Sequence, residues 1–460
     1  MNNVYDVVIS RGRVMDPESS LDGVRDVGIT DGRVAAISKG ALEGRSTIDA
    51  TGLVVSSGFI DMHSHGQNRE NYEAQARDGV TSCLELEVGA ADIDAWYGER
   101  EGSSLVNFGA SAGHIPVRMK VIPDPGNIVP IADAAYREST DAEMAEILDD
   151  IERGLQRGGL AVGFGLAYTI AASRWEILEV FRVAAKYDAA CHVHMRGSGL
   201  IGPMDSIEGM EEILAASAIT GARLHLVHIS STGRQAVPQL LQMIEEAQSR
   251  GMDVTTECYP YAAGMTEMGA AFLNEDDWQH KLGIDYEDME WTLTGERLTA
   301  STFAEYRETN GMVIMHMIPD DIVDISVASP LTSIATDGLL EDGKGHPRTA
   351  GSYSRVLGHF VRERGILTLM DALRKSSLMP AQRLEHRTPA MKRKGRVHVG
   401  ADADLVAFDL DRIIDRATYA EPALPPDGMV HVLVNGVPVV SDGVLQEGAT
   451  PGQPVRAPIS

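Results

Sequence analysis

Cysteine is scarce in this 460-residue sequence, which contains only Cys83, Cys191 and Cys258. Three widely spaced thiols cannot form a disulfide framework and favour a reducing compartment, so we expect a cytoplasmic protein. The sequence also lacks any apolar run approaching the length of about 18 residues that crosses a bilayer. Its first residues, MNNVYDVVISRGRV, show neither the basic segment nor the apolar stretch of a signal peptide.

Basic residues are also few: 40 Lys and Arg stand against 67 Asp and Glu, which gives a formal net charge of −27. This excess of negative charge argues against nucleic acid and anionic membranes as partners. Hydrophobic residues make up 43% and charged residues 23% of the chain, as in a globular protein with a sizeable core. The length is sufficient for two or three domains of average size, or for one large α/β barrel with a small second domain.

Both ends of the sequence have the pattern of short β-strands separated by turns. Residues 4–55 alternate apolar and polar positions, with β-branched residues and a turn-forming Asp-Gly pair at 31–32. Residues 395–409 and 431–443 return to the same pattern. We therefore predict one small β-sandwich domain built from residues 1–57 and 391–460, in which the last dozen residues form a loose tail.

The middle of the sequence alternates strands with helices. Capping boxes, which pair a Ser or Thr with a Glu three residues later, predict helices that begin after Thr140 and Ser173. Short β-rich segments such as LAVGF and AACHVH follow these helices, which implies βαβ units and a parallel sheet. We predict a (β/α)8 TIM-type barrel over residues 58–390, with residues 264–310 as an insertion. About nine candidate strands compete for the eight places of such a barrel, and the surplus one lies around 312–316.

Residues able to bind a metal recur where the candidate barrel strands end. His63 and His65 close GFIDMHSH and share one face, because residues two apart on a strand point the same way. Glu85 and Glu87 end SCLELE in the same manner. Three further strand ends carry a His or an Asp: His194, His228 and Asp337.

These positions predict a catalytic zinc site. The C-terminal strand ends form the active site of a (β/α)8 barrel, and catalytic zinc takes imidazole and carboxylate ligands while one position stays open for water. A single strand-end histidine is more often a hydrogen-bonded core residue, and His192 and His225 fit that description. A full set, whose members end separate strands, favours a metal centre with one or two Zn²⁺ per chain.

Several short motifs follow one another in order along nearly the whole chain. They are GFIDMHSHG at 58–66, HMRG at 194–197, VHIS at 227–230, ECYPYAAG at 257–264, ATDG at 335–338 and GADADLVAFD at 400–409. In these motifs the chain resembles the amidohydrolase superfamily and is similar, within it, to the N-acyl-D-amino-acid deacylase (D-aminoacylase) family. The resemblance implies a (β/α)8 barrel with a β-sandwich flank, and a zinc-dependent amide hydrolase that releases a carboxylic acid and a D-amino acid.

The resemblance also implies roles for single residues. Asp337 would be the general base that takes a proton from the attacking water and returns it to the leaving nitrogen. Where the family has a cysteine ligand after the second strand, this chain reads LELEVG, so we expect Glu87 to substitute, with Glu85 as the alternative. The other implied metal ligands are His63, His65, His194 and His228.

The substrate contacts of the family are matched in part. Arg348 in GHPRTAG corresponds to the arginine that holds the substrate carboxylate, and Tyr168 and Tyr259 correspond to tyrosines that assist it. A family lysine and a family serine have no counterpart, since Ser230 and Met265 occupy their positions. The expected partner is a small-molecule substrate that carries an amide and a carboxylate.

Two other functions fit part of the pattern. A cyclic-amide hydrolase of the dihydroorotase or hydantoinase type would share the barrel, but LAVGFGLAY offers no strand-end lysine to be carboxylated. A glutamate bridge would still allow a two-metal site there. A non-catalytic barrel scaffold is disfavoured by the complete set of histidines and Asp337. The sequence leaves open the acyl group, the amino-acid side chain and whether the chain forms a homo-oligomer.

Overall fold

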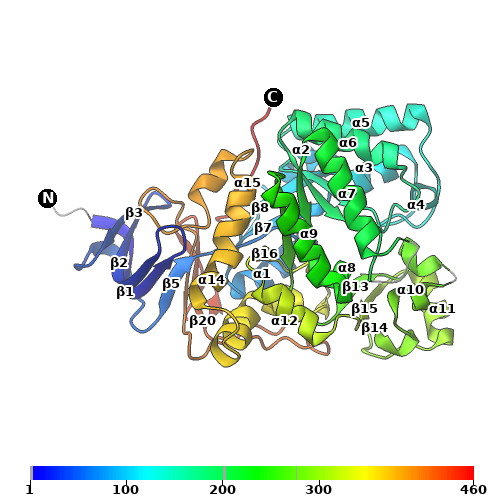
Figure 1. The fold of residues 1–460 in the computed structure, drawn as a ribbon. Coiled ribbons are helices and arrows are strands. Elements are labelled where there is room, and N and C mark those ends of the chain that lie inside the picture. The colour runs from blue at the N-terminus through cyan, green and yellow to red at the C-terminus, as the bar shows by residue number, and fades with distance from the viewer. Residues whose placement is uncertain (1–3, 200–203, 276) are drawn as a thin grey trace.

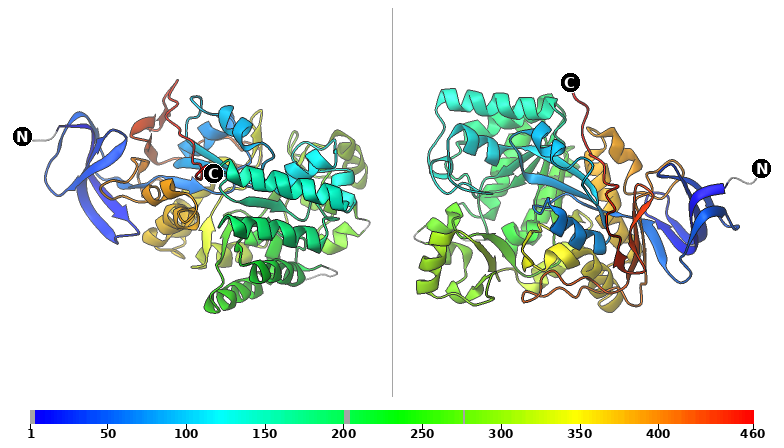
Figure 2. Two further views of the ribbon diagram at one scale, coloured as in Figure 1. Left: turned by 90° about the horizontal axis from the view of Figure 1, so that it is seen from above. Right: turned by 180° about the vertical axis from the view of Figure 1, so that it is seen from behind.

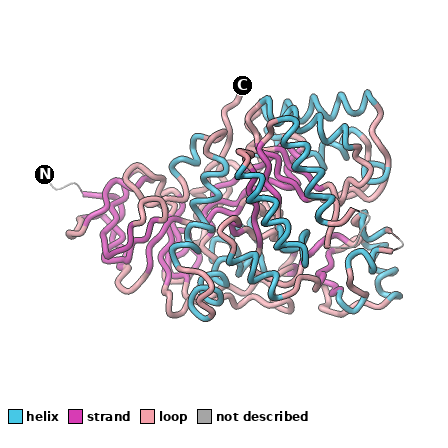
Figure 3. The backbone as a smooth tube through the Cα atoms, viewed as in Figure 1, coloured by secondary structure: helices cyan, strands magenta, loops and turns pink. Residues whose placement is uncertain are grey.

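The structure, a computed structural model, describes residues 4–199, 204–275 and 277–460. At its centre, eight parallel strands form one sheet that curves into a barrel (Figure 1, Figure 3). This confirms the predicted (β/α)8 TIM-type barrel. Its strands follow one another in chain order: β6 (Phe59–Asp61), β7 (Val80–Ala90), β8 (Asn107–Gly113), β9 (Val162–Gly165), β10 (Ala190–His194), β11 (Arg223–Leu226), β12 (Val254–Cys258) and β16 (Thr332–Ile334).

Helices pack around the outside of this barrel. Helix α5 (Asp141–Gln156) begins with the predicted capping box between Thr140 and Glu143, and α6 (Arg174–Lys186) begins after Ser173 as predicted. Further outer helices are α1 (Arg69–Arg77), α7 (Ser206–Thr220), α9 (Val237–Ser249), α12 (Asp320–Ala328) and α13 (Arg348–Arg355). Among the described residues, no helix combines the length and the apolar character that a membrane span needs.

The barrel closes between its first and last strands through residues just beyond their ends. The backbone N–H of Asp337 donates to the carbonyl of His63 at 2.7 Å, and the N–H of His65 donates to the carbonyl of Gly338 at 3.0 Å. The hydrogen bonds that complete the barrel therefore involve the same residues that the sequence predicts for the active site.

A three-stranded antiparallel sheet lies beside the barrel (Figure 1). It consists of β13 (Gly264–Glu267), β14 (Met289–Trp291) and β15 (Met312–Met315). The surplus strand expected around 312–316 is thus β15, which pairs outside the barrel. Together with α10 (Trp278–Leu282) and α11 (Ala300–Thr309), this sheet encloses its own hydrophobic cluster, which includes Met289, Trp291, Phe303 and Val313.

Strands from both chain ends form one β-rich unit on the other side of the barrel (Figure 2). Strand β1 (Val4–Asp16) pairs antiparallel with β2 (Leu21–Thr30) and parallel with β4 (Glu43–Asp49) and β5 (Val54–Ser57). All nine strands belong to a single sheet, which encloses a cluster including Ile9, Val27, Val55, Leu405 and Leu433. The remaining strands are β3 (Arg33–Ser38), β19 (Leu405–Phe408), β20 (Met429–Val434), β21 (Val437–Ser441) and β22 (Val444–Leu445).

The C-terminal tail is not loose, so that expectation was wrong. Phe108 in β8 donates its N–H to the carbonyl of Gln453 at 3.2 Å, and its carbonyl accepts the N–H of Val455 at 2.7 Å. The tail therefore satisfies backbone groups of a barrel strand that would otherwise need another partner.

Asp404 connects the terminal sheet to the barrel. It precedes β19 and is only 3% exposed. Its carboxylate accepts hydrogen bonds from Lys394 Nζ at 2.6 Å, from Asn107 Nδ2 at 3.0 Å and from the N–H of Asn435 at 2.7 Å. Because Asn107 begins β8, a single buried charge links the two parts of the molecule.

Replacing Asp404 with Ala should destabilise the fold, because the buried Lys394 ammonium then keeps only Asp402, at 3.2 Å, as a counter-charge, and Asn107 and Asn435 lose an acceptor. Removing one partner of a buried ion pair costs about 3–5 kcal/mol, and we expect a loss of this size in urea unfolding. The exposed Asp411 provides the matched control, since Asp411→Ala should change the free energy of unfolding by less than about 0.5 kcal/mol. Equal stability of the two variants would refute the role given to Asp404.

Candidate metal centre and active site

The predicted site residues lie at one end of the barrel, but most of them lie beyond their strands. His194 ends β10 as expected. In contrast, β6 ends two residues before His63, β11 ends two residues before His228, and β16 ends three residues before Asp337. His228 and Asp337 have left-handed backbones with φ of 30° and 52°, which is strained for residues with a side chain. These turns carry the chain out of the sheet and into the site.

The side chains form two groups of potential metal ligands that share one residue. Each of His63, His65, Glu87 and Asp337 offers a ligand atom within 4.8 Å of the others. Ligand atoms of Glu87, His194 and His228 lie within the same distance of one another. Glu87 belongs to both groups, so the arrangement can hold one ion or two.

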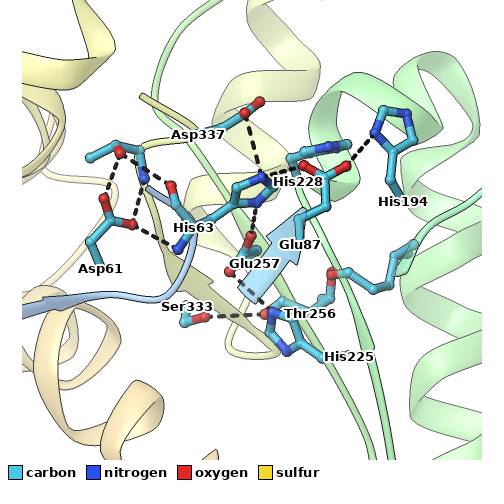
Figure 4. A network of polar contacts seen from close by, with 12 residues as sticks. Asp61, His63, Glu87, His194, His225, His228, Thr256, Glu257, Ser333 and Asp337 are labelled. Carbon is cyan, nitrogen blue, oxygen red and sulfur yellow. Dashed lines mark hydrogen bonds and ion pairs between the residues drawn. The ribbon is translucent and has the colours of Figure 1, made fainter. Parts of the chain in front are cut away.

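Glu87 occupies the centre of the site. Its Oε2 lies 2.8 Å from His63 Nε2, and its Oε1 lies 2.8 Å from His194 Nδ1 (Figure 4). The same Oε2 lies 3.2 Å from His65 Nε2. Glu85, the alternative left open by the sequence, lies behind His65, with its Oε2 2.8 Å from the other ring nitrogen, Nδ1. The two glutamates therefore contact different sides of the same histidine.

Sequence reasoning missed Glu257, which is fully buried near the end of β12. Its carboxylate lies 2.6 Å from His63 Nδ1 and 3.1 Å from His225 Nε2 (Figure 4). This contact orients the His63 ring so that Nε2 faces Glu87, as carboxylates behind metal-binding histidines commonly do. The rule that found the other residues, a titratable side chain near the end of a barrel strand, also describes Glu257.

The buried carboxylates of the site require positive charge nearby. Burial lowers the pKa of His63, but the carboxylates of Asp337, Glu87 and Glu257 outweigh burial and raise that pKa well above its usual value. Burial raises the pKa of Glu257, yet hydrogen bonds with His225 and His63 lower it to about 2. The carboxylates therefore stay ionised, and a proton or a metal ion must balance them.

These residues fit a zinc ion in the chemistry of their donor atoms. Imidazole nitrogen and carboxylate oxygen are the ligands of catalytic zinc. Burial and the nearby His194 lower the pKa of His228 to about 3, so its ring is neutral, as a metal ligand must be. The site thus combines neutral imidazole with ionised carboxylate at a buried position.

A cavity of about 330 Å³ opens beside the ligand groups. Tyr168 and Tyr259 line it together with His194, His228 and Asp337. The small antiparallel sheet and its helices contribute apolar residues to the opposite wall, among them Phe272, Leu282, Met315 and Met317. The cavity therefore joins the titratable residues of the barrel to a wall that is largely apolar but also includes Glu275 and Lys281.

Arg348 lies next to Asp337 and lines a smaller pocket of about 30 Å³, which shares Tyr168 and Asp337 with this cavity. It is 1% exposed, its Nη1 lies 2.9 Å from Asp337 Oδ2, and its guanidinium stacks over the ring of Tyr259 at 4.5 Å. Its Nε and Nη1 make no aligned hydrogen bond within the described chain, and neither does the buried Tyr259 hydroxyl. Burial raises the pKa of Asp337, but the charges of Arg348 and His63 lower it below its usual value.

Comparison with known proteins agrees with this geometry. The model of the Amidohydrolase family matches residues 147–440. The chain belongs to the amidohydrolase family. It is 30% identical to an N-acyl-D-glutamate deacylase of Alcaligenes xylosoxydans xylosoxydans over 95% of this chain and 94% of that protein. Membership confirms the predicted class of enzyme, a hydrolase that acts on carbon–nitrogen bonds other than peptide bonds.

Two further relatives match this chain over different fractions of its length. A solved N-acyl-D-glutamate deacylase from Bordetella bronchiseptica, complexed with zinc and a phosphonate mimic of the tetrahedral intermediate, has a TM-score of 0.85 and 26% identity. It covers 99% of this chain and 100% of its own. A dihydroorotase of Solibacter usitatus is 28% identical over 58% of this chain and 62% of that protein.

Glu257→Gln should weaken metal binding, because an amide holds the His63 ring less strongly and makes its far nitrogen less basic. Loss of such a carboxylate costs about 10–100-fold in metal affinity, measurable by competition with a chromophoric chelator. Glu290→Gln is the matched control, since Glu290 is also buried and lies 3.0 Å from a histidine, His316, outside the ligand groups. If both variants bind zinc as wild type does, Glu257 does not act through His63.

Proposed function

We propose that this amidohydrolase is a zinc-dependent N-acyl-D-amino-acid deacylase, which releases a carboxylic acid and a D-amino acid. The observation that carries the proposal is the buried Arg348 guanidinium, which lies beside Asp337 and within reach of the ligand groups. An arginine there can hold the substrate carboxylate with two hydrogen bonds. The full-length likeness to an N-acyl-D-glutamate deacylase supports the same substrate class.

We assign the metal to His63, His65, Glu87, His194 and His228, as one ion or two. The two ligand groups that share Glu87 support this assignment. When bound, zinc polarises the amide carbonyl and lowers the pKa of water.

Asp337 moves the proton in this proposal. Its carboxylate takes a proton from the water as the new C–O bond forms, and delivers it to the amide nitrogen as the C–N bond breaks. Oδ1 of Asp337 lies 3.1 Å from His65 Nε2, and Oδ2 faces Arg348. The low pKa of Asp337 supports this role, because the base must be ionised before the reaction begins.

Tyr259 and Tyr168 complete the proposed substrate site. The Tyr259 hydroxyl has no aligned partner among the described residues and lines the cavity, so it is free to donate to the substrate carbonyl oxygen. The Tyr168 ring contacts His194 edge to face at 5.0 Å, which supports a role in shaping the wall next to that ligand. The high pKa of both tyrosines, caused by burial, keeps them protonated donors.

A cyclic-amide hydrolase is the weaker candidate. Two dihydroorotases are 28% identical over 58% of the chain and 24% identical over 88% of it, whereas the N-acyl-D-glutamate deacylase is 30% identical over 95%. We also propose that residues 58–390 form the catalytic domain, with 264–310 as an insertion, that residues 1–57 and 391–460 form the other domain, and that the enzyme acts in the cytoplasm.

Asp337→Asn should abolish most turnover, because the amide keeps the shape of the side chain and cannot take the proton. A general base contributes about 10²–10⁴-fold, so kcat should fall by that factor while the zinc content, measured by plasma emission spectroscopy, largely survives. The matched control is Asp342→Asn, an exposed aspartate whose backbone is also left-handed, with φ of 51°. A variant that keeps more than about a tenth of wild-type turnover would disprove this role of Asp337.

Arg348→Ala should remove the energy of the carboxylate contact, about 2–5 kcal/mol in kcat/KM. Arg348→Lys should restore only part of it, since an ammonium lacks the planar fork. Removing the carboxylate from the substrate should lower kcat/KM of the wild type by about the same factor as Arg348→Ala does. The same change of substrate should lower kcat/KM of the Arg348→Ala variant only a little further. The four values of kcat/KM form a cycle, and additive losses would mean that the arginine and the carboxylate do not meet.

Arg355→Ala is the control for that cycle. Arg355 lies in the same helix, α13, and also stacks on a tyrosine, with its guanidinium 4.9 Å from the ring of Tyr261. Its loss should change kcat/KM by the same factor for both substrates.

A further inference from the structure

A second cavity, of about 490 Å³, lies at the opposite end of the barrel from the ligand groups. Arg223 and Thr255, at the beginnings of β11 and β12, line it, and so does Arg383 of helix α15 (Met379–Leu384). Its inner wall includes His225, which contacts Glu257 inside the barrel. This space, which we call the floor cavity, has no part in the proposed hydrolysis.

Arg383, which lines the floor cavity, has hydrogen-bond donors without a partner among the described residues. Its side chain is 4% exposed, and its Nη1 donates to Asp253. Its Nε and Nη2 are buried and find no acceptor anywhere in the described chain. A buried guanidinium with two unsatisfied nitrogens is costly, so a bound anion that supplies them with an acceptor would stabilise this site.

The charges around the floor cavity are unbalanced. Four cations, Arg223, Arg374, Arg383 and Lys392, line it against only two carboxylates, those of Asp253 and Glu385. Two of these groups also have partners outside the lining: Glu385 accepts a hydrogen bond from Arg396 at 2.6 Å, and Arg223 donates to Asp188 at 2.9 Å. The cavity therefore carries an excess of two positive charges in a chain whose net charge is −27.

We propose that the floor cavity binds the phosphate group of a small molecule. A phosphate monoester carries a charge of about −2 at neutral pH and three acceptor oxygens, which matches both the excess charge and the free nitrogens of Arg383. Arginine forks recognise phosphate through paired hydrogen bonds. The site is independent of the deacylase assignment, because none of its lining residues belongs to the ligand groups or the substrate cavity.

Calorimetric titration of the zinc-loaded protein with inorganic phosphate, against chloride at equal ionic strength, tests the proposal. We expect saturable binding of one phosphate per chain, and acetate should bind at least about tenfold more weakly because it carries half the charge. Arg374→Gln and Arg383→Gln should each weaken phosphate binding about tenfold or more. Lys39→Gln removes one positive charge from an exposed lysine that is distant in sequence from the lining residues, and it should leave phosphate affinity unchanged.

Two features keep the test decisive. Arg383→Gln could impair folding through Asp253, whereas Arg374 is only half-buried, and its one hydrogen bond to the described chain goes to the carbonyl of Pro330 at 3.3 Å. Arg348→Gln separates the two ends of the barrel. If Arg348→Gln lowers the phosphate affinity and Arg374→Gln does not, phosphate binds in the substrate cavity and the proposal is overturned. The absence of saturable binding up to about 10 mM phosphate would overturn it as well.

Discussion

The contact of Glu87 with three histidines is the interaction on which the rest of the site depends. A carboxylate that is 2% exposed reaches His63, His65 and His194, which come from two parts of the barrel. An ionised carboxylate at such a position is tolerable only beside positive charge. The surrounding histidines, and the metal ion that they are suited to bind, provide that charge.

Closure of the barrel and assembly of the site are the same structural event. The backbone bonds between His63 and Asp337 and between His65 and Gly338 join the first strand to the last. Asp61, fully buried, reinforces this junction, because its carboxylate accepts hydrogen bonds from the N–H groups of His63 and Thr336, both at 3.1 Å. The ligand side chains are therefore positioned by the backbone that completes the fold, which keeps their geometry rigid.

The two ends of the barrel differ in charge. Histidines and ionised carboxylates make up the ligand end, where they favour a metal cation, whereas cations outnumber carboxylates in the floor cavity, where they favour an anion. His225 and Glu257 lie between these ends and connect them through one hydrogen bond. One parallel barrel thus provides two chemically opposite environments along its axis.

Local sequence patterns determined the elements and most of the site. Capping boxes located α5 and α6, and strand-end positions identified His63, His65, the Glu85 and Glu87 pair, His194, His228 and Asp337, because parallel strands in a barrel bring their C-terminal ends together. The roles of these residues, and of Arg348, Tyr168 and Tyr259, remain proposals.

Only the tertiary structure decided the features that depend on contacts distant in the chain. The choice between Glu85 and Glu87 at the centre of the ligand groups follows from contacts with histidines of other strands, since Glu87 reaches His63 and His194 whereas Glu85 reaches only His65. The course of the tail along β8 follows from backbone pairing, about which its composition says nothing. The unpaired donors of Arg383 arise because α15 packs against the floor of a barrel whose strands begin far away in sequence. Hydrophobic periodicity and secondary-structure propensity depend on residues that are close in sequence. Burial and charge balance depend on neighbours that only folding brings together.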